Sequence, residues 1–171
     1  VAGASKGEGL GNKFLANIRE SSAIINVVRC FEDENVSHVN GRVDPLSDIE
    51  TITTELALSD LNTLEKRSVK LEKLQKSGDK KVRFEYELVN KCLGPLNNFG
   101  SLKGVTFERQ EKIVLASFNL LTLKPMMFVA NISENEFTDN KYLSELKSFA
   151  SKINIPVVTI CASLEAQLVD F

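Results

Sequence analysis

Two short polar segments carry the residues in this sequence that are best suited to chemistry. The first is residues 131–134, which follow the near-continuous apolar run 126–130. Such a run predicts a strand that is buried on both faces. Ligands bind at the carboxyl ends of the strands in an open α/β sheet, so an amide, a hydroxyl and a carboxylate there could bind one. The alternative is that Asn131 and Ser133 only turn the chain and cap the next helix.

The second segment is Cys161, Ala162 and Ser163. It follows the apolar run 155–160, which predicts another buried strand, and it leads into a last helix. Two strand ends of the chain therefore carry polar or small residues.

Other common kinds of site find little support in the sequence. The three cysteines are far apart and form no CxxC pair, and His38 is the only histidine. A Cys/His zinc site or a Ser-His-Asp triad would have to be built from single distant residues. We expect the cysteines to be reduced and buried in a cytosolic protein, and we expect no metal site in this chain.

Composition excludes several further classes of function. The 171 residues carry a formal net charge of -2 and 26% charged residues, which is ordinary for a soluble protein. Neither a nucleic-acid-like charge bias nor an apolar run long enough to span a membrane is present. The chain opens on Val1 and runs straight into a glycine-rich segment, so we expect a piece of a longer protein.

The glycine-rich opening does not match a known phosphate-binding fingerprint. Glycines at positions 3, 7, 9 and 11 are typical of a mobile or ligand-shaped loop. The spacing does not fit GxGxxG, and no Gly-Lys dipeptide occurs, so GxxxxGK[ST] cannot be matched.

The rest of the pattern predicts an α/β protein. Apolar runs predict strands near 23–31, 124–131 and 155–161, paired in parallel across helical crossovers. Helical periodicity is found at 10–20, 106–121 and 141–152.

A long helical excursion interrupts this pattern after the first strand. Apolar spacing predicts helices over 46–75 and 82–96, joined by a turn at 77–79 and stopped near Gly94 and Pro95. Two such helices make an αα-hairpin. Basic residues gather near its tip, namely Lys66, Arg67, Lys70, Lys73, Lys76, Lys80, Lys81 and Arg83. They form either a solvated helical face or an arm that contacts RNA phosphates or an acidic protein surface.

Five motifs together carry a resemblance to a known family. They are GEGLGN at 7–12, VDPLSDIE at 43–50, LTLKPM at 121–126, NISE at 131–134 and CAS at 161–163. NISE and CAS resemble the fourth and fifth nucleotide-binding motifs of a translation-factor-class G domain, with Glu134 in place of the aspartate of NKxD. The combination over the whole chain resembles the YchF family, also called the Obg-like ATPases.

The resemblance implies a partial P-loop NTPase sheet with an inserted α-helical hairpin. In that interpretation residues 1–42 and 105–171 are parts of the G domain and 43–104 form the arm. The full-length protein would bind ATP or GTP with Mg²⁺, prefer ATP, hydrolyse it to ADP, and associate in the cytoplasm with ribosomes or ribosomal RNA. The arm lysines Lys70, Lys73, Lys80 and Lys81 would make that contact.

The family pattern also assigns roles to individual residues. Asn131 would hydrogen-bond the base edge, Ile132 would pack on the ring, and Cys161, Ala162 and Ser163 would border the base. The aspartate of NKxD accepts from the N1 and amino groups of guanine, a donor pair that adenine lacks. A displaced carboxylate at Glu134 would therefore relax selection for guanine.

Other parts of the family pattern are missing from this sequence. Gly7, Gly9 and Gly11 would belong to the second switch, but the P-loop lysine, the magnesium-binding hydroxyl and the DxxG aspartate are absent. Those groups position and neutralise the phosphates, so we expect no catalytic residue here and no hydrolysis by this chain alone. Two alternatives remain open: a non-enzymatic, nucleotide-gated ribosome or RNA-binding module that acts through the arm, and a doubly wound protein unrelated to nucleotides.

Overall fold

The computed structural model describes residues 11–33 and 42–169. The helices are α1 (Gly11–Glu20), α2 (Pro45–Leu74), α3 (Lys80–Phe99), α4 (Arg109–Ala116), α5 (Lys141–Lys152) and α6 (Ala162–Val169). The strands are β1 (Ile24–Arg29), β2 (Met126–Asn131) and β3 (Val157–Ile160), and two 3-10 turns are η2 (Gln75–Ser77) and η3 (Leu121–Leu123). The chain divides into two compact units, one of residues 1–22 and 51–124 and one of residues 23–50 and 125–171.

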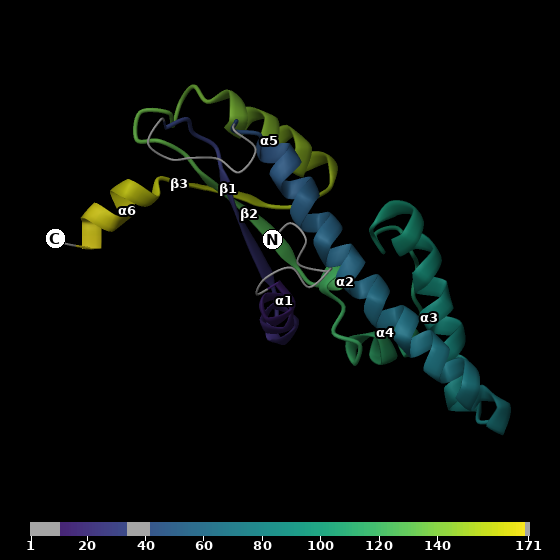
Figure 1. Cartoon of the computed structure of the whole chain (residues 1–171). Coiled ribbons are helices and arrows are strands. Elements are labelled where there is room, and N and C mark those ends of the chain that lie inside the picture. Colours follow the sequence, from purple (N-terminus) through teal and green to yellow (C-terminus); the bar gives the residue numbers. More distant parts are fainter. Residues whose placement is uncertain (1–10, 34–41, 170–171) are drawn as a thin grey trace. The chain divides into compact units, whose positions relative to one another are not determined.

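The second of these units contains a parallel three-stranded sheet in the order β1-β2-β3 (Figure 1). Val27 pairs with Val129, which pairs in turn with Val158. The three predicted strands, their parallel pairing and the mixed α/β class are therefore confirmed. Parallel pairing also brings the carboxyl ends of the strands to one edge of the sheet.

One face of this sheet is buried and the other is open. Helix α5 covers one face of the sheet (Figure 1). On that face Val28, Phe128 and Ala130 form a buried cluster with Leu143 and Leu146 of α5. The alternating residues of the same strands point away from it, as the two-residue period of a strand requires. Ile25, Val27 and Val158 are 61%, 62% and 45% exposed on that side.

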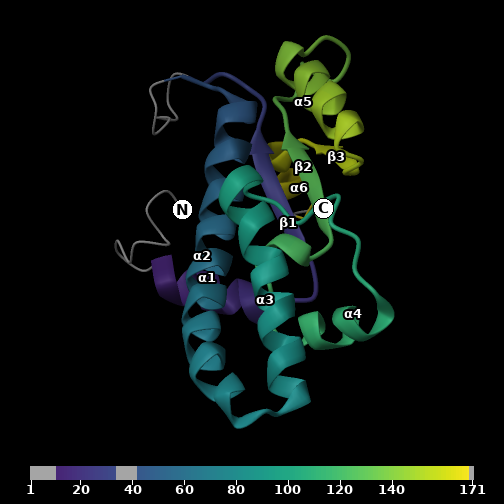
Figure 2. The ribbon, with the colours of Figure 1, turned by 90° about the vertical axis from the view of Figure 1, so that its right-hand side faces the viewer.

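The first unit contains the predicted helical hairpin. Figure 2 shows α3 running back along α2, and η2 joins the two helices. Gly78 ends η2 with a φ of 78°, a left-handed conformation that glycine adopts without a steric penalty. The side chain of Asp79 then caps α3 by accepting a hydrogen bond from the backbone N–H of Lys81 at 2.8 Å.

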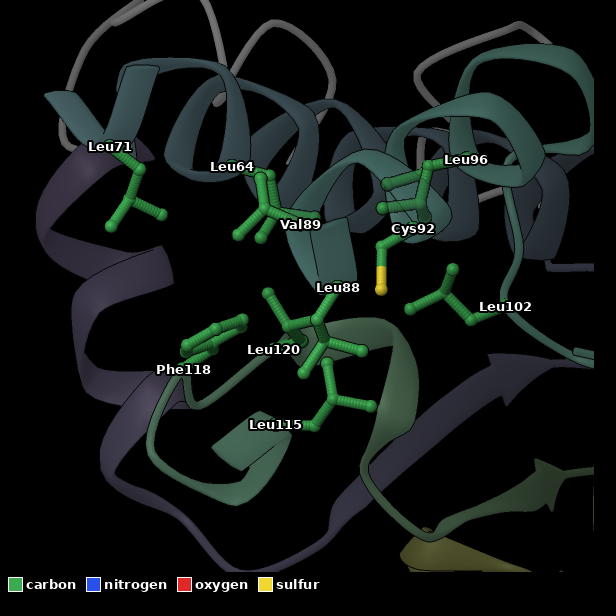
Figure 3. Packing of buried hydrophobic residues seen from close by; sticks show 11 residues of the cluster. Leu64, Leu71, Leu88, Val89, Cys92, Leu96, Leu102, Leu115, Phe118 and Leu120 are labelled. Atoms are coloured by element: carbon green, nitrogen blue, oxygen red, sulfur yellow. The ribbon is translucent and has the colours of Figure 1, made fainter. Parts of the chain in front are cut away.

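The hairpin shares a core with the segment that follows it. Figure 3 shows buried side chains of α2 and α3 packed with those of the segment after them. The labelled residues of this cluster are Leu64, Leu71, Leu88, Val89, Cys92 and Leu96 from the two helices, and Leu102, Leu115, Phe118 and Leu120 from the segment that follows. The apolar stripes recognised in the sequence thus form one cluster with α4 and the residues before η3.

A buried carboxylate joins three elements of the same unit. Asp60 on α2 has no exposed surface and accepts hydrogen bonds from the backbone N–H groups of Leu121 and Thr122, at 3.0 and 2.8 Å. Arg19 of α1 donates to the same carboxylate at 3.0 Å and also bonds the carbonyl oxygen of Asn119. This network fixes the end of α1 and the η3 turn against α2.

The predicted stop of the hairpin's second helix near Gly94 and Pro95 is wrong. α3 continues through Pro95 to Phe99. It ends because Gly100 adopts a left-handed φ of 61° and donates its backbone N–H to the carbonyl of Leu96 at 2.9 Å.

The helix predicted over 106–121 is also shorter in the structure, where α4 covers Arg109–Ala116. A capping box fixes its start, because the Glu108 side chain accepts from the third helical N–H and Glu111 accepts from the backbone N–H of Glu108. Asn119 breaks the helical path after it, with a φ of 49°. The backbone N–H groups that follow bind Asp60 instead of continuing a helix.

Candidate functional site

The candidate site lies at the carboxyl edge of the sheet, where one hydrogen bond joins the two polar segments. Asn131 ends β2 and Ala162 begins α6 directly after β3. The backbone N–H of Ala162 donates to Oδ1 of Asn131 at 3.0 Å. The structure therefore brings together residues that the sequence separates by a strand and a helix.

Two residues of these segments are buried rather than open to solvent. The side chains of Ile132 and Cys161 are 2% exposed and belong to the core of the sheet unit. The backbone N–H of Ile132 donates to the carbonyl of Ile160 at 2.9 Å, which extends the pairing of β2 with β3 by one bond. Packing of Ile132 on a bound ring stays a prediction, because its side chain points into the core here.

The remaining residues of the two segments are accessible. Ser163 is exposed in the first turn of α6, and its hydroxyl lies 3.1 Å from the sulfur of Cys161. Glu134 is exposed in a turn in which the backbone N–H of Glu136 donates to the carbonyl of Ser133 at 3.2 Å. An exposed carboxylate and an exposed hydroxyl therefore belong to the two segments that the Asn131–Ala162 hydrogen bond joins.

The bonding of Asn131 limits what its side chain can offer a ligand. Its Oδ1 atom already accepts from Ala162, and no described residue takes a hydrogen bond from its Nδ2 atom. An amide nitrogen is a donor only, with two hydrogens. Asn131 can therefore present a donor to an acceptor such as the N7 atom of a purine.

A second asparagine, which the sequence analysis missed, holds the loop between β2 and α5. Asn140 caps α5 by accepting from the backbone N–H of Leu143 at 2.8 Å. Its Nδ2 atom donates to the carbonyl oxygen of Cys30 at 2.7 Å and to the carboxylate of Glu136 at 3.0 Å. The only signal in the sequence is that an asparagine directly precedes a helical pattern.

Titration of two neighbouring groups is shifted by this environment. Burial raises the pKa of the Cys30 thiol to about 11, so the thiol is neutral at physiological pH. A hydrogen bond from the Tyr142 hydroxyl to Glu32 joins α5 to the residues after β1 and raises the pKa of Tyr142.

The arm lysines form a separate surface. Lys70, Lys73, Lys80 and Lys81 are exposed, and no described carboxylate lies within ion-pair distance of them. Arg67 is different, because it pairs with Glu85 and stacks over the Phe118 ring at 4.2 Å.

Some of the residues named in the sequence analysis lie outside the part of the chain that the structure describes. Gly7, Gly9 and His38 lie outside the described residues, while Gly11 begins α1. Within residues 11–33 and 42–169 no group of three or more His, Cys, Asp or Glu side chains could hold a metal ion. No helix of the described part is long and apolar enough to span a bilayer.

Comparison with known proteins gives a consistent result over the whole chain, although no protein-family model matches it. The chain is 49% identical over 170 residues to the ribosome-binding ATPase YchF of Haemophilus influenzae. It is 47% identical to the protein of the same name from Escherichia coli O157:H7 and 42% identical to that from Bacillus subtilis. Each alignment covers 99% of this chain and 47% of the relative, so the chain spans about half the length of the curated relatives it matches.

A solved structure shows the same relationship. The YchF GTPase of Schizosaccharomyces pombe superposes with a TM-score of 0.83 at 29% identity. The match covers 95% of this chain and 46% of the fission yeast chain. The fold of this chain is therefore similar to that of part of the fission yeast protein.

Proposed function

Since this chain is homologous along its whole length to about half of the YchF proteins, we propose that it is the base-binding half of a nucleotide hydrolase. In the natural protein that contains these residues, ATP would be bound with Mg²⁺ and hydrolysed to ADP, with ATP preferred to GTP. The relatives are named ribosome-binding ATPases, and we propose that this protein also associates with ribosomes.

The observation that carries the proposal is the hydrogen bond between Ala162 and Asn131. It holds two strand ends together at the edge where open α/β sheets bind ligands, and it leaves the Nδ2 atom of Asn131 as a donor. Adenine and guanine both offer N7 as an acceptor, so this donor alone cannot distinguish the two bases.

Discrimination between adenine and guanine must then come from protein groups that hydrogen-bond base atoms other than N7. A carboxylate accepts hydrogen bonds from the exocyclic amine of adenine or from the donor pair of guanine. Glu134 is the exposed carboxylate in the turn next to Asn131, and we assign the preference for ATP to its displaced position. Cys161, Ala162 and Ser163 would border the base from the side of β3.

Hydrolysis would require parts that these 171 residues do not contain. The groups that position phosphates and magnesium in P-loop enzymes have no counterpart in this sequence, so the chain alone should not hydrolyse ATP. In the natural protein the segment with Gly7, Gly9 and Gly11 would act as part of the second switch.

Calorimetric titration with magnesium ATP and magnesium GTP tests the proposed function, with the intact mass of the sample measured first. In the natural protein we expect Asn131→Ala to weaken binding of both nucleotides and Glu134→Ala to change the ratio of their affinities. Glu145→Ala is the control, because Glu145 is an exposed carboxylate on α5 whose loss should change neither quantity. Unchanged ATP and GTP binding in both site variants would contradict the proposal.

A second candidate function is a nucleotide-gated ribosome or RNA-binding module in which the arm makes the contact. The exposed lysines Lys70, Lys73, Lys80 and Lys81, which form no ion pair with a carboxylate among the described residues, favour it. Reversing these four charges should weaken ribosome association and reduce its salt dependence, because fewer phosphate contacts release fewer counterions. Association with an unchanged salt dependence would exclude the arm as the contact.

A further inference from the structure

The loop that carries Glu134 is held at both of its ends. At its start, Asn131 pairs with the neighbouring strands, and its carbonyl accepts from the backbone N–H of Cys30 at 2.8 Å. At its end, Asn140 donates to the carbonyl of the same Cys30 at 2.7 Å. Both ends of the loop are therefore fixed to one residue at the end of β1.

A third attachment lies inside the loop. Glu136 is two residues from Glu134, and its carboxylate accepts the second hydrogen bond from Nδ2 of Asn140 at 3.0 Å. The backbone N–H of Glu136 closes the turn with Ser133. The conformation of the segment 133–136 therefore depends on the side chain of Asn140.

Asn140 uses all of its hydrogen-bonding capacity for this purpose. Its side chain is 8% exposed in total, both amide hydrogens are donated, and Oδ1 accepts from Leu143. An amide that satisfies three separate partners can hold only one orientation without losing a buried bond. We call Asn140, Glu136 and the Cys30 carbonyl the Asn140 clamp.

Resting on the proposed function, we infer that the Asn140 clamp positions Glu134 and thereby sets the preference for ATP over GTP. Asn140 and Glu136 are positioning residues, since they act on the base through the turn that carries Glu134. The position of a carboxylate decides from which base it can accept hydrogen bonds. In a loosened turn the Glu134 carboxylate could accept from either base, so the preference would fall.

Variants of Glu136 test the clamp with little change to the fold. Glu136→Ala removes one anchor but keeps the helix cap and the bond to Cys30. Glu136→Gln keeps an oxygen that can accept from Asn140. In the natural protein we expect Glu136→Ala to lower the ratio of ATP to GTP affinity about fivefold, the effect of one net hydrogen bond, while Glu136→Gln stays near wild type.

Asn140→Asp tests the other half of the clamp. Aspartate is as good a helix cap as asparagine, but it places an acceptor against the Cys30 carbonyl and the Glu136 carboxylate. We expect a larger loss of the affinity ratio than for Glu136→Ala. Asp79→Ala removes the cap of α3 and is the control, with an expected loss of stability and an unchanged ratio.

The outcomes separate this inference from the proposed function. A wild-type protein that binds neither nucleotide overturns both. A wild-type protein that prefers ATP, with the same ratio in Glu136→Ala as in Glu136→Gln, overturns the clamp alone. The comparison of Glu136→Ala with Glu136→Gln tests the clamp even if Asn140→Asp does not fold.

Discussion

At the scale of single residues, Asp60 combines complete burial with a negative charge. Its carboxylate is satisfied by Arg19 from α1 and by two backbone N–H groups of η3, all of them distant in the sequence. A buried charge is tolerated only when such partners are supplied. This single side chain therefore joins three segments of the helical unit.

Replacement of Asp60 by alanine should destabilise the protein by about 3–5 kcal/mol, because Arg19 and the N–H groups of Leu121 and Thr122 lose their acceptor. Urea unfolding followed by circular dichroism measures the change. Asp79→Ala is the matched control, since it removes an exposed cap and should cost about 1 kcal/mol. Equal shifts of the two midpoints would show that the buried network contributes no more than a cap.

The sequence indicates that Asp60 is buried, although its hydrogen-bond network could not be predicted. Leu56, Asp60 and Leu64 follow one another at intervals of four, so a carboxylate stands on the apolar stripe of α2. Periodicity indicates that Asp60 is buried, but it does not say which distant donors meet it. Asn140 was missed for the same reason, since its partners Cys30 and Glu136 come together only in the folded sheet.

At the scale of elements, α3 contains a glycine where helical geometry does not require one. A Cβ atom added at Gly94 would meet no atom within 4 Å, and its φ is not left-handed. Gly100 has the opposite character, because its φ of 61° ends the helix. Gly94, inside α3, is therefore replaceable, whereas Gly100, the C-cap that follows the helix, is required for its end.

Gly94→Ala should raise the free energy of unfolding by about 0.5–1 kcal/mol, because alanine loses less backbone entropy in a helix. Gly100→Ala should lower it by about 1 kcal/mol, because a side chain is strained in the left-handed region. Thermal or urea unfolding of the two variants measures both changes. Shifts of the same sign would contradict the assigned roles.

The hairpin shows where sequence rules succeed and where they fail at this scale. The apolar stripes and the turn at 77–79 predict two antiparallel helices, and that prediction is confirmed. The stop at Gly94 and Pro95 fails because Pro95 removes only one backbone donor, and packing of Val89, Cys92 and Leu96 carries the helix past it. Local breakers are thus outweighed when the residues on both sides are buried in one core.

At the scale of the whole molecule, the open face of the sheet exposes apolar side chains to solvent. Val27, Val129 and Val158 lie in one row across the three strands, and Ile25 lies beside them. Contiguous apolar surface is rare on soluble monomers unless something covers it. Within the described residues β1 also pairs on one side only, with β2, so its other edge carries unpaired backbone groups.

The 171-residue chain made alone should therefore bind a hydrophobic dye and self-associate, and Val27→Lys should reduce both. Val69→Lys is the matched control, because Val69 is also an exposed valine, 55% exposed, but belongs to α2 and not to the sheet. Dye fluorescence and sedimentation measure the two effects.

Comparison with the natural protein then shows whether this face is an interior surface. The curated relatives are about twice as long as this chain, and we expect a protein of that length to cover the row of valines and to bind little dye. In that protein Val27→Lys should be destabilising rather than beneficial, because a buried lysine costs free energy unless it is paired. A longer protein in which Val27→Lys leaves stability unchanged would mean that the face is open in the complete molecule as well, and a partner would then have to be sought for it.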